Sequence, residues 1–449
     1  MWEFVRYIFI IFLACLLFFS CRKDQLVEDS NALLNFSTDT IMFDTVFTDI
    51  GSVTLQLKVY NPYKQAVNIS SISLGKSTSS NFRLNINGFA SDEARNIVLQ
   101  ANDSLYIFVE VTVNPNLLNN PFVIHDSIIF NINGNRQDVD LVAWGQNANY
   151  INGQMISSET WTSERPYLIY NSIGVDSNSV LTIEAGSKIY FHKNSGLLVW
   201  GTLIVNGSFE EPVIIQGDRL ESDYEDIPGQ WGGIRLYSGS GNNSINWTEI
   251  KNAIVGIQIG TLDNQPTQNL QLNNCKIMNM NYAGIYALGS VIEVNNCVIS
   301  DCGFYAVALL VGGSYTFNHC TVANYWKYSN RTTSSVIISN NAQFGEALYV
   351  GDLDKSEWNN SIIYGTYENE IGIGVDAGAA LNYRFHHCMI KLKSDYDISN
   401  VSNYYNIYRE DSPDFINHNE SDFQLDTLSP AMNKGDINIV NQNLLKLEY

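Results

Sequence analysis

Between residues 33 and 147, apolar side chains alternate with polar ones. In "SVTLQLKVYNP" (52–62), apolar residues occupy every second position until the run ends at Asn-Pro. A period of two places alternate side chains on opposite faces of a strand. Further runs of this kind follow, and Asn133-Gly134 between two of them can supply the positive φ angles of a hairpin turn. We therefore predict an N-terminal β-sandwich of about seven strands over residues 33–147.

The second half of the chain repeats a short motif. Its template is an apolar residue, Asn or His, a second residue that is usually polar, a small Thr, Cys or Ser, any residue, and Ile or Val. Six copies fit the template: "INWTEI" (245–250), "LNNCKI" (272–277), "VNNCVI" (294–299), "FNHCTV" (317–322), "WNNSII" (358–363) and "FHHCMI" (385–390). A repeat of about 22–27 residues without a helical period predicts a β-solenoid, in which each coil pairs with the next. One interval is longer because it contains an insertion at 324–343.

The spacing within the motif predicts a bend. The apolar residue and the small residue three positions later can both face the interior only if the chain turns between them. Asn tolerates the left-handed conformation that such a turn needs, and Asn side chains of successive coils can form a hydrogen-bonded ladder. The small residues should then stack in one buried column: Thr248, Cys275, Cys297, Cys320, Ser361 and Cys388. We expect free thiols, because these side chains point the same way rather than toward each other.

A second strand is expected after each of the first five copies, following a turn. The segments are 255–260, 283–289, 305–313, 345–352 and 371–378. Parallel stacking of such strands favours a right-handed winding. The chain is therefore expected to be all-β, with a β-sandwich followed by a right-handed parallel β-helix of about ten coils over residues 167–440. Residues 148–166 are expected to form a polar connector.

The N-terminus has the features of an export signal. Residues 7–19 are uniformly apolar, which is short for a membrane span but suits the apolar core of a signal peptide. The sequence "FFSCRKDQ" that follows resembles a bacterial lipobox, which implies cleavage after residue 20 and lipidation of Cys21. Residues 21–32 would then form a tether. We expect an outer-membrane lipoprotein of the cell envelope, exposed at the surface, whose partner through this anchor is the membrane.

Two families resemble parts of the chain. The segments "LTIEAGSKIYF" (181–191), "SGLLVWGTLIVNGSFEEPVIIQG" (195–217) and "PGQWGGIRLY" (228–237), with the closing "SPAMNKGD" (429–436), resemble bacterial lipoproteins of the pectin-lyase-like superfamily. The order of strands in 33–147 resembles immunoglobulin-like modules of the Hydin/abnormal-spindle type. The first resemblance implies a right-handed parallel β-helix, and the second implies a spacer or docking module. Neither implies one activity, because the β-helix fold carries lyases, hydrolases, adhesins and spacers.

Charge limits the choice of partners. The chain has 46 acidic and 25 basic residues, for a net charge of −21. Such a surface repels nucleic acid, so we expect no nucleic-acid partner. We expect a monomer, and a polysaccharide or glycoprotein as the ligand.

Candidate chemistry on the β-helix is sparse. The paired aspartates, His-Gly and Arg-x-Lys of polygalacturonase-like enzymes are absent from its sequence, and so is a pectate-lyase-like carboxylate set with its basic partner. Asp352, Asp354 and Asp376 could share one face and bind Ca²⁺, with solvated surface acids as the alternative. His386 and His387 occupy the bend positions of the sixth motif copy. We expect them to be members of the ladder rather than metal ligands.

Aromatic residues provide another candidate site. Five of them lie in or after the insertion: Tyr325, Trp326, Tyr328, Tyr364 and Tyr367. Rings on a segment that protrudes from a regular rod can stack on a sugar, although they could instead pack onto the flank of the coil. The leading hypothesis is therefore non-catalytic glycan binding or adhesion without a cofactor, with Ca²⁺ as the one candidate ion. A polysaccharide lyase or glycoside hydrolase with a carboxylate site, and a purely structural envelope spacer, are the alternatives.

Overall fold

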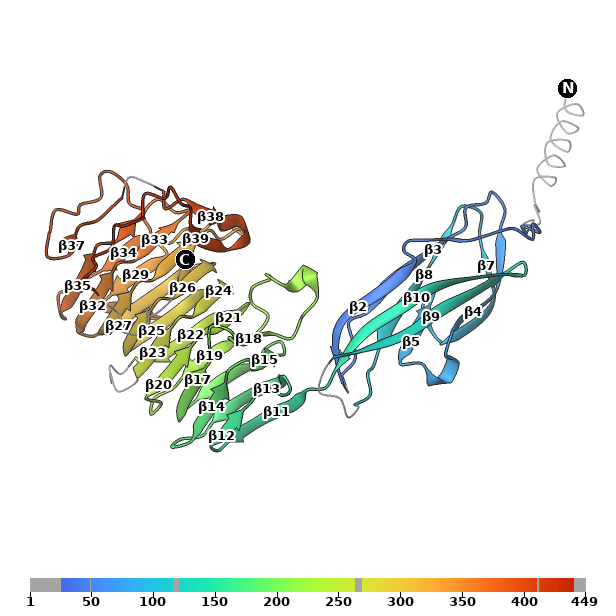
Figure 1. The fold of residues 1–449 in the computed structure, drawn as a ribbon, viewed down its shortest axis with the longest axis horizontal. Coiled ribbons are helices and arrows are strands. Elements are labelled where there is room, and N and C mark those ends of the chain that lie inside the picture. Colours follow the sequence, from blue (N-terminus) through green and yellow to red (C-terminus); the bar gives the residue numbers. More distant parts are fainter. Residues whose placement is uncertain (1–25, 49, 116–120, 263–268, 410–411, 440–449) are drawn as a thin grey trace, which may run out of the picture. The chain divides into compact units, whose positions relative to one another are not determined.

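A computed structural model describes most of the chain. The described ranges are 26–48, 50–115, 121–262, 269–409 and 412–439. The chain divides into two compact units between Asn147 and Ala148 (Figure 1). Cys21 and the predicted signal peptide lie outside the described residues. Within the described part, no helix is long and apolar enough to cross a membrane.

The regular structure of both units is β, in agreement with the predicted class. The helical elements described are three short 3₁₀ turns: η1 (Ser77–Ser79), η2 (Ser222–Tyr224) and η3 (His418–Glu420). The chain is rich in Asn, Ser, Gly, Thr and Tyr, which favour turns and strands rather than long helices.

The first unit consists of two five-stranded sheets around one hydrophobic core (Figure 1). One sheet has the order β1 (Asn35–Phe36), β3 (Leu55–Tyr60), β8 (Ser104–Val111), β5 (Phe82–Ile86), β6 (Phe89–Ala90). The other has the order β2 (Thr40–Phe47), β10 (Asn135–Gln146), β9 (Phe122–Ile132), β4 (Val67–Leu74), β7 (Glu93–Leu99). Strand β8 shows the alternation read from the sequence, since its buried and less buried residues follow each other one by one.

The turn predicted at Asn133-Gly134 is confirmed. The two residues have φ angles of 46° and 86° and join β9 to β10, which pair in antiparallel register. Strand β2 pairs with β10 in parallel, while the other strand pairs of these two sheets are antiparallel. The immunoglobulin-like assignment of this unit stays a prediction.

The second unit is built on one 25-stranded sheet of parallel neighbours, wound so that its strands form three tracks. The first track contains the first part of β11 (Asn149–Ile156) and of β13 (Tyr167–Val175), then β15 (Lys188–Phe191), β18 (Val213–Gly217), β21 (Thr248–Lys251), β24 (Lys276–Met280), β26 (Val298–Cys302), β28 (Thr321–Asn324), β33 (Ile362–Gly365) and β36 (Met389–Ile390).

The second and third tracks complete the coils. The second contains the later parts of β11 and β13, then β16 (Gly196–Val199), β19 (Gly233–Leu236), β22 (Val255–Gly260), the starts of β25 (Ala283–Asn295) and β27 (Tyr305–Asn318), β29 (Val336–Ser339) and β34 (Ile371–Gly374). The third contains β12 (Glu159–Trp161), β14 (Val180–Glu184), β17 (Thr202–Asn206), β20 (Asn243–Asn246), β23 (Asn269–Asn273), the ends of β25 and β27, β32 (Leu353–Asn359), β35 (Leu381–His386) and β37 (Tyr404–Tyr405). One continuous hydrophobic core fills the interior.

Two sequence expectations differ from the structure. The predicted connector, 148–166, supplies β11 and β12, which pair with β13 and β14 and so form a coil. The segment 345–352 is not a coil strand, because its β31 (Ala347–Val350) forms an antiparallel hairpin with β30 (Asn341–Phe344). The coil strand is β29, inside the predicted insertion, whose side chains are largely buried while those of β31 are largely exposed. Burial of the apolar "VIIS" decides which segment joins the sheet.

The bend predicted from the motif is confirmed at all six copies. The third motif residue has a positive φ angle in each: Trp247, Asn274, Asn296, His319, Asn360 and His387, between 47° and 56°. Asn and His tolerate this left-handed conformation, which L-residues otherwise avoid. Bending there lets the flanking apolar and small residues share the interior.

The asparagines at the second motif position of the first five copies form a ladder along the β-helix. Asn273 donates through Nδ2 to Oδ1 of Asn246 at 2.9 Å, and Asn295 donates to Asn273 at 3.0 Å. Asn318 and Asn359 extend the ladder with bonds of 2.9 Å each. Each of the three inner amides thus donates to one coil and accepts from the next, so these carboxamides satisfy each other at the bend.

The small motif residues lie buried behind this ladder, and each bonds to the backbone. The Cys297 Sγ and the Ser361 Oγ donate to the carbonyl oxygen two residues earlier, at 3.3 and 2.8 Å. The same contact occurs at Thr248, Cys275, Cys320 and Cys388. A small side chain with an O–H or S–H donor fits this position, which explains why Thr, Cys and Ser interchange there.

The thiols of the second unit are expected to resist labelling in the native protein. All five described cysteines are free and buried, and burial raises the pKa of Cys320 and Cys388 to about 12. Since the thiolate is the reactive form, a thiol reagent should label them slowly in buffer and fast in urea. Mass spectrometry of tryptic peptides would show which cysteines react. Rapid native labelling of Cys297 would contradict the buried column.

Candidate functional site

The aromatic residues of the insertion do not form an open surface. Trp326 is only 9% exposed, and its Nε1 donates to the Ser329 Oγ at 2.9 Å. Tyr325 is covered by Phe415, His418 and Phe423 of the hairpin β38 (Phe415–Asn417) and β39 (Asp422–Leu425). Tyr328 is exposed, and its hydroxyl donates to the carbonyl oxygen of Asp226 at 2.7 Å. The C-terminal hairpin therefore covers Tyr325, while Tyr328 remains exposed.

The two later tyrosines are also in contact with cations rather than free. The Lys391 Nζ lies 5.3 Å from the centre of the Tyr364 ring, and the guanidinium carbon of Arg331 lies 5.8 Å from that of Tyr367. Both rings are partly buried. Of the five predicted ligand-binding residues, four are buried or partly buried and Tyr328 is exposed, so most of these rings pack onto the coils rather than facing a ligand.

The three predicted calcium ligands do not converge. The Asp352 Oδ1 accepts from the backbone N–H of Ala380, and the Asp376 Oδ1 accepts from that of Gly378, both at 2.8 Å. Asp354 instead lines a groove. In the part of the chain that the structure describes, these carboxylates do not approach one another as a set of three within ligand distance. Their arrangement does not support a shared Ca²⁺ site.

The groove that contains Asp354 lies on the outer face of the third track. It has a volume of about 440 Å³ and is lined by Asp354, Lys355, Ser356, Glu357, Leu381, Asn382, Tyr383, Arg384, Ser402 and Asn403. Most of these side chains are polar, and both signs of charge are present. The groove therefore suits a neutral polar ligand better than an apolar one.

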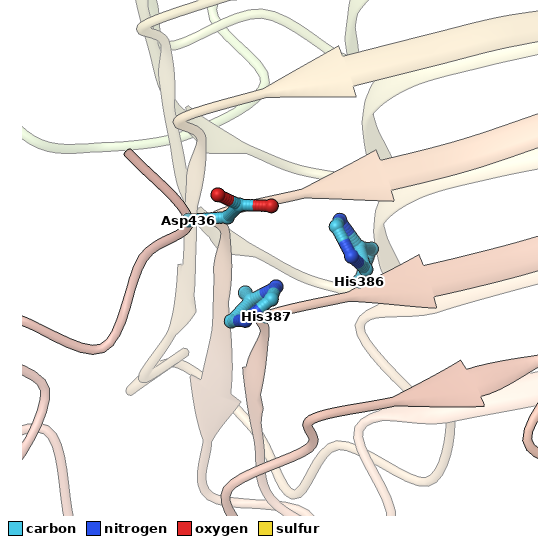
Figure 2. Close-up of side chains that lie close together, drawn as sticks. All are labelled: His386, His387 and Asp436. Carbon is cyan, nitrogen blue, oxygen red and sulfur yellow. The ribbon is translucent and has the colours of Figure 1, made fainter. Parts of the chain in front are cut away.

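Beside the groove, three potential ligand side chains come together from two distant segments. His386 ends β35, His387 directly follows it, and Asp436 belongs to the C-terminal tail (Figure 2). One ligand atom from each residue lies within 4.8 Å of the other two. The imidazole centroids are 4.4 Å apart, and the ring planes are nearly perpendicular at 85°. The sequence predicted that the two histidines were ladder members, and only the folded tail shows the third residue.

The local environment favours the protonation states in which these side chains carry a free electron pair. Burial lowers the pKa of His386, and the neighbouring His387 lowers it further. The Asp436 carboxyl has a lowered pKa, first because it accepts from the backbone N–H of Asn438, and the two imidazoles contribute to the same effect. Near neutral pH, His386 is therefore a neutral imidazole with a lone pair, beside an ionised carboxylate.

An aromatic cluster that the sequence did not predict lies on the outer face of the second track, where β25 and β27 begin. We call Tyr282, Tyr286, Phe304 and Tyr305 the aromatic patch. The Tyr282 ring lies 5.1 Å from Phe304, 5.9 Å from Tyr286 and 6.1 Å from Tyr305, measured between centroids. Phe304 is 46% exposed, and the three tyrosines are partly buried. Its members follow the same bend in successive coils, so aligning the second strands of the repeat could have revealed them.

The backbone explains why the rings lie together. The N–H of Tyr282 donates to the carbonyl oxygen of Ile254 at 2.8 Å, and the N–H of Phe304 donates to that of Tyr282 at 3.0 Å. These residues are therefore stacked from one coil to the next. Burial raises the pKa of Tyr286 to about 12, so its phenol stays a neutral hydrogen-bond donor. The patch is thus a group of neutral rings with polar hydroxyl edges.

Polar side chains continue the patch along the second track. In the parallel register, Gln258 on β22 is the partner of Tyr286, and Arg235 on β19 is the partner of Gln258. Arg235 is exposed and bonds through Nη1 to the Tyr237 hydroxyl at 3.2 Å. Planar donors and acceptors therefore adjoin the rings on one face.

The fold agrees with a known family. The family model described as the right handed beta helix region matches residues 167–322 and again 266–411. Together the matches cover 167–411, which is more than half of the chain, and the protein belongs to this family of right-handed β-helix proteins. No curated protein matches the chain.

Three similar solved structures each match a little over a quarter of this chain at low identity. A family 123 glycoside hydrolase from Clostridium perfringens, studied for glycolipid glycan hydrolysis, is 9% identical over 27% of this chain and 30% of its own, with a TM-score of 0.20. A Porphyromonas gingivalis W83 protein of unknown function is 12% identical over 28% of this chain and 60% of its own, with a TM-score of 0.19. The ASH / PapD-like domain of human CEP192 is 8% identical over 28% of this chain and 92% of its own, with a TM-score of 0.18. Similarity this low carries no argument about function.

Proposed function

We propose that this protein is a lipid-anchored protein of the bacterial cell envelope that binds a glycan through the outer face of its β-helix. The aromatic patch carries the proposal. Ring faces of Tyr and Phe pack against the apolar face of a sugar ring, while tyrosine hydroxyls bond to its hydroxyl groups. Gln258 and Arg235 supply further planar hydrogen-bonding groups on the same face. The coils hold these groups rigidly, which lowers the entropic cost of binding.

In this proposal the rest of the chain places the patch at the surface. Acyl chains on Cys21 would hold the protein to the outer membrane, and the first unit would act as an immunoglobulin-like spacer. The net charge of −21 favours a neutral or cationic glycan over a strongly acidic one. The proposed role is binding without turnover, because the β-helix sequence lacks the polygalacturonase-like and pectate-lyase-like catalytic patterns.

Loss of ring stacking should weaken glycan binding. We expect Tyr282→Ala and Phe304→Ala each to reduce the affinity for a bound polysaccharide by about 2- to 10-fold, the range that one aromatic contact contributes. The full chain in detergent would be titrated with fluorescently labelled neutral and acidic polysaccharides, and the same mixtures would be assayed for new reducing ends and unsaturated products.

A matched variant separates the patch from general effects. Phe209→Ala removes a ring that is 63% exposed elsewhere on the β-helix, where it packs edge-on against Trp247, and should leave affinity unchanged. Equal losses for Phe209→Ala and Phe304→Ala would refute the patch. Product formation would support the lyase or hydrolase alternative instead, and no affinity for any polysaccharide would support a structural spacer.

A further inference from the structure

The first observation is that His386 leaves the ladder in which its motif position places it. Its strand register pairs it with Asn359 of the previous coil and Tyr405 of the next. Among the described residues, its ring accepts and donates no hydrogen bond, so the amide ladder ends at Asn359. The His386 ring instead stacks on Tyr405, with centroids 5.0 Å apart and planes inclined by 24°. Both of its nitrogens remain available for another partner.

The second observation concerns the nitrogen atoms of His387. Its Nε2 lies 2.7 Å from the Asn406 Nδ2, and the Asn406 carboxamide can present either its N–H₂ or its oxygen to this atom. Its Nδ1 is shielded from solvent and has no hydrogen-bond partner in the described structure. When Asn406 accepts a proton from Nε2, Nδ1 carries a free lone pair. Histidines that bind metals are commonly oriented by such a second hydrogen bond on the other nitrogen.

The third observation is how the tail holds Asp436 beside these rings. The backbone N–H of Asp436 donates to the Asn360 Oδ1 at 2.7 Å, and its carbonyl accepts from the Asn360 Nδ2 at 3.0 Å. Further along, the His319 Nε2 lies 3.0 Å from the carbonyl oxygen of Ile439. The Asp436 Oδ1 accepts from Asn438, and its other oxygen has no described partner. The tail therefore lies along the bend column and presents one carboxylate oxygen.

We propose that His386, His387 and Asp436 bind a transition-metal dication of the Zn²⁺ class. Two imidazole nitrogens and one carboxylate oxygen are a ligand set typical of zinc sites that keep a fourth position open. Ligand atoms around tetrahedral zinc are about 3.4 Å apart, so atoms now within 4.8 Å need only a small contraction. The nitrogen donors disfavour Ca²⁺ and Mg²⁺, which prefer oxygen ligands. This site is separate from the aromatic patch.

A bound ion would link two segments that are otherwise joined by hydrogen bonds. It would fasten the C-terminal tail to the last coils at the bend column. Arg384, two residues before His386 on β35, lines the neighbouring groove, so the open metal position would adjoin that groove. Metal binding would therefore both order the tail and add a Lewis-acidic position at the groove.

The test is a titration of the metal-free full chain in detergent with Zn²⁺, followed by calorimetry. We expect saturable binding of a single equivalent, competition by Ni²⁺ and none by Ca²⁺. His386→Asn and Asp436→Asn should each weaken binding by at least about tenfold, a loss typical of metal-site substitutions. His386→Asn inserts the residue type that the preceding coils use in the ladder, so the coil should still form.

A control variant and a second readout make the outcome decisive. His319→Asn changes another histidine of the same bend column that contacts the tail but is outside the ligand set, and it should bind Zn²⁺ like the unmodified chain. Trypsin cleavage after the exposed Lys434 should slow at least several-fold with Zn²⁺ in the unmodified chain and not in Asp436→Asn. Binding weaker than about 1 mM, or binding that His386→Asn and His319→Asn leave equally intact, would overturn the proposal.

Discussion

Glu370→Gln is expected to lower the free energy of unfolding of the β-helix by about 3–5 kcal/mol, the loss typical of breaking a buried ion pair. Glu370 and Arg331 are 0% and 1% exposed, and their nearest charged atoms are 2.5 Å apart. The carboxylate also accepts from the backbone N–H and the hydroxyl of Ser335, and from the N–H of Tyr367. A glutamine of nearly the same shape places an N–H₂ group against these donors and leaves the guanidinium uncompensated.

The measurement is urea unfolding of the full chain followed by circular dichroism, with hydrogen exchange to assign the transition to the second unit. The matched control is Glu368→Gln, two residues away, whose pair with Lys393 is also short at 2.6 Å but lies on the surface. Exposed pairs contribute little, so its unfolding midpoint should not move. If the two variants shift the midpoint equally, burial is not what makes the Glu370 pair important.

Trp358→Ala is expected to cost about 3–5 kcal/mol, as other truncations of a buried aromatic residue do. Trp358 is completely buried in a column of rings from successive coils. Its ring lies parallel to that of Phe317 with centroids 3.8 Å apart, and 6.1 Å from that of Phe385. Phe385 in turn stacks on Tyr404 at 5.8 Å. Removing one ring leaves a cavity that its two neighbours cannot fill, because their backbones are fixed in the sheet.

Urea unfolding measures this change as well, and Trp358→Phe provides the comparison. Phenylalanine occupies the same position in the coils before and after, so this variant should retain most of the stability. The exposed Phe209→Ala should have no measurable effect. Similar losses for Trp358→Ala and Phe209→Ala would mean that the ring column does not stabilise the β-helix.

The motif itself contains enough information to predict the bend. Three positions separate its apolar and small residues, and Asn or His occupies the second bend position in five of six copies. Those local constraints hold in the six motif copies, so the left-handed φ angles, the Asn246–Asn359 ladder and the buried Cys297 thiol follow from the sequence. Repetition makes this possible, because each coil mainly contacts its neighbours in sequence.

Where the repeat is interrupted, the sequence was a poorer guide. The insertion could have placed Trp326 outward or inward, and its burial depends on contacts made after folding. The strand at 336–339 was hidden because the more conspicuous segment 345–352 contains glycines, as the other predicted second strands do. The local sequence pattern does not distinguish between two candidate strands, because which of them pairs with the sheet depends on the space available there.

The all-β class, the repeat, the position of each bend and the chemistry of the buried column could all be predicted from the order of residues along the chain. These features depend on residues a few positions apart or one coil apart. Three features became visible only in the folded chain: the hairpin β38–β39 covers Tyr325, Tyr282 and Phe304 join in one patch, and Asp436 lies beside His386 and His387. The tail reaches those histidines by folding back along the bend column, and no periodic pattern specifies where a non-repeating segment docks.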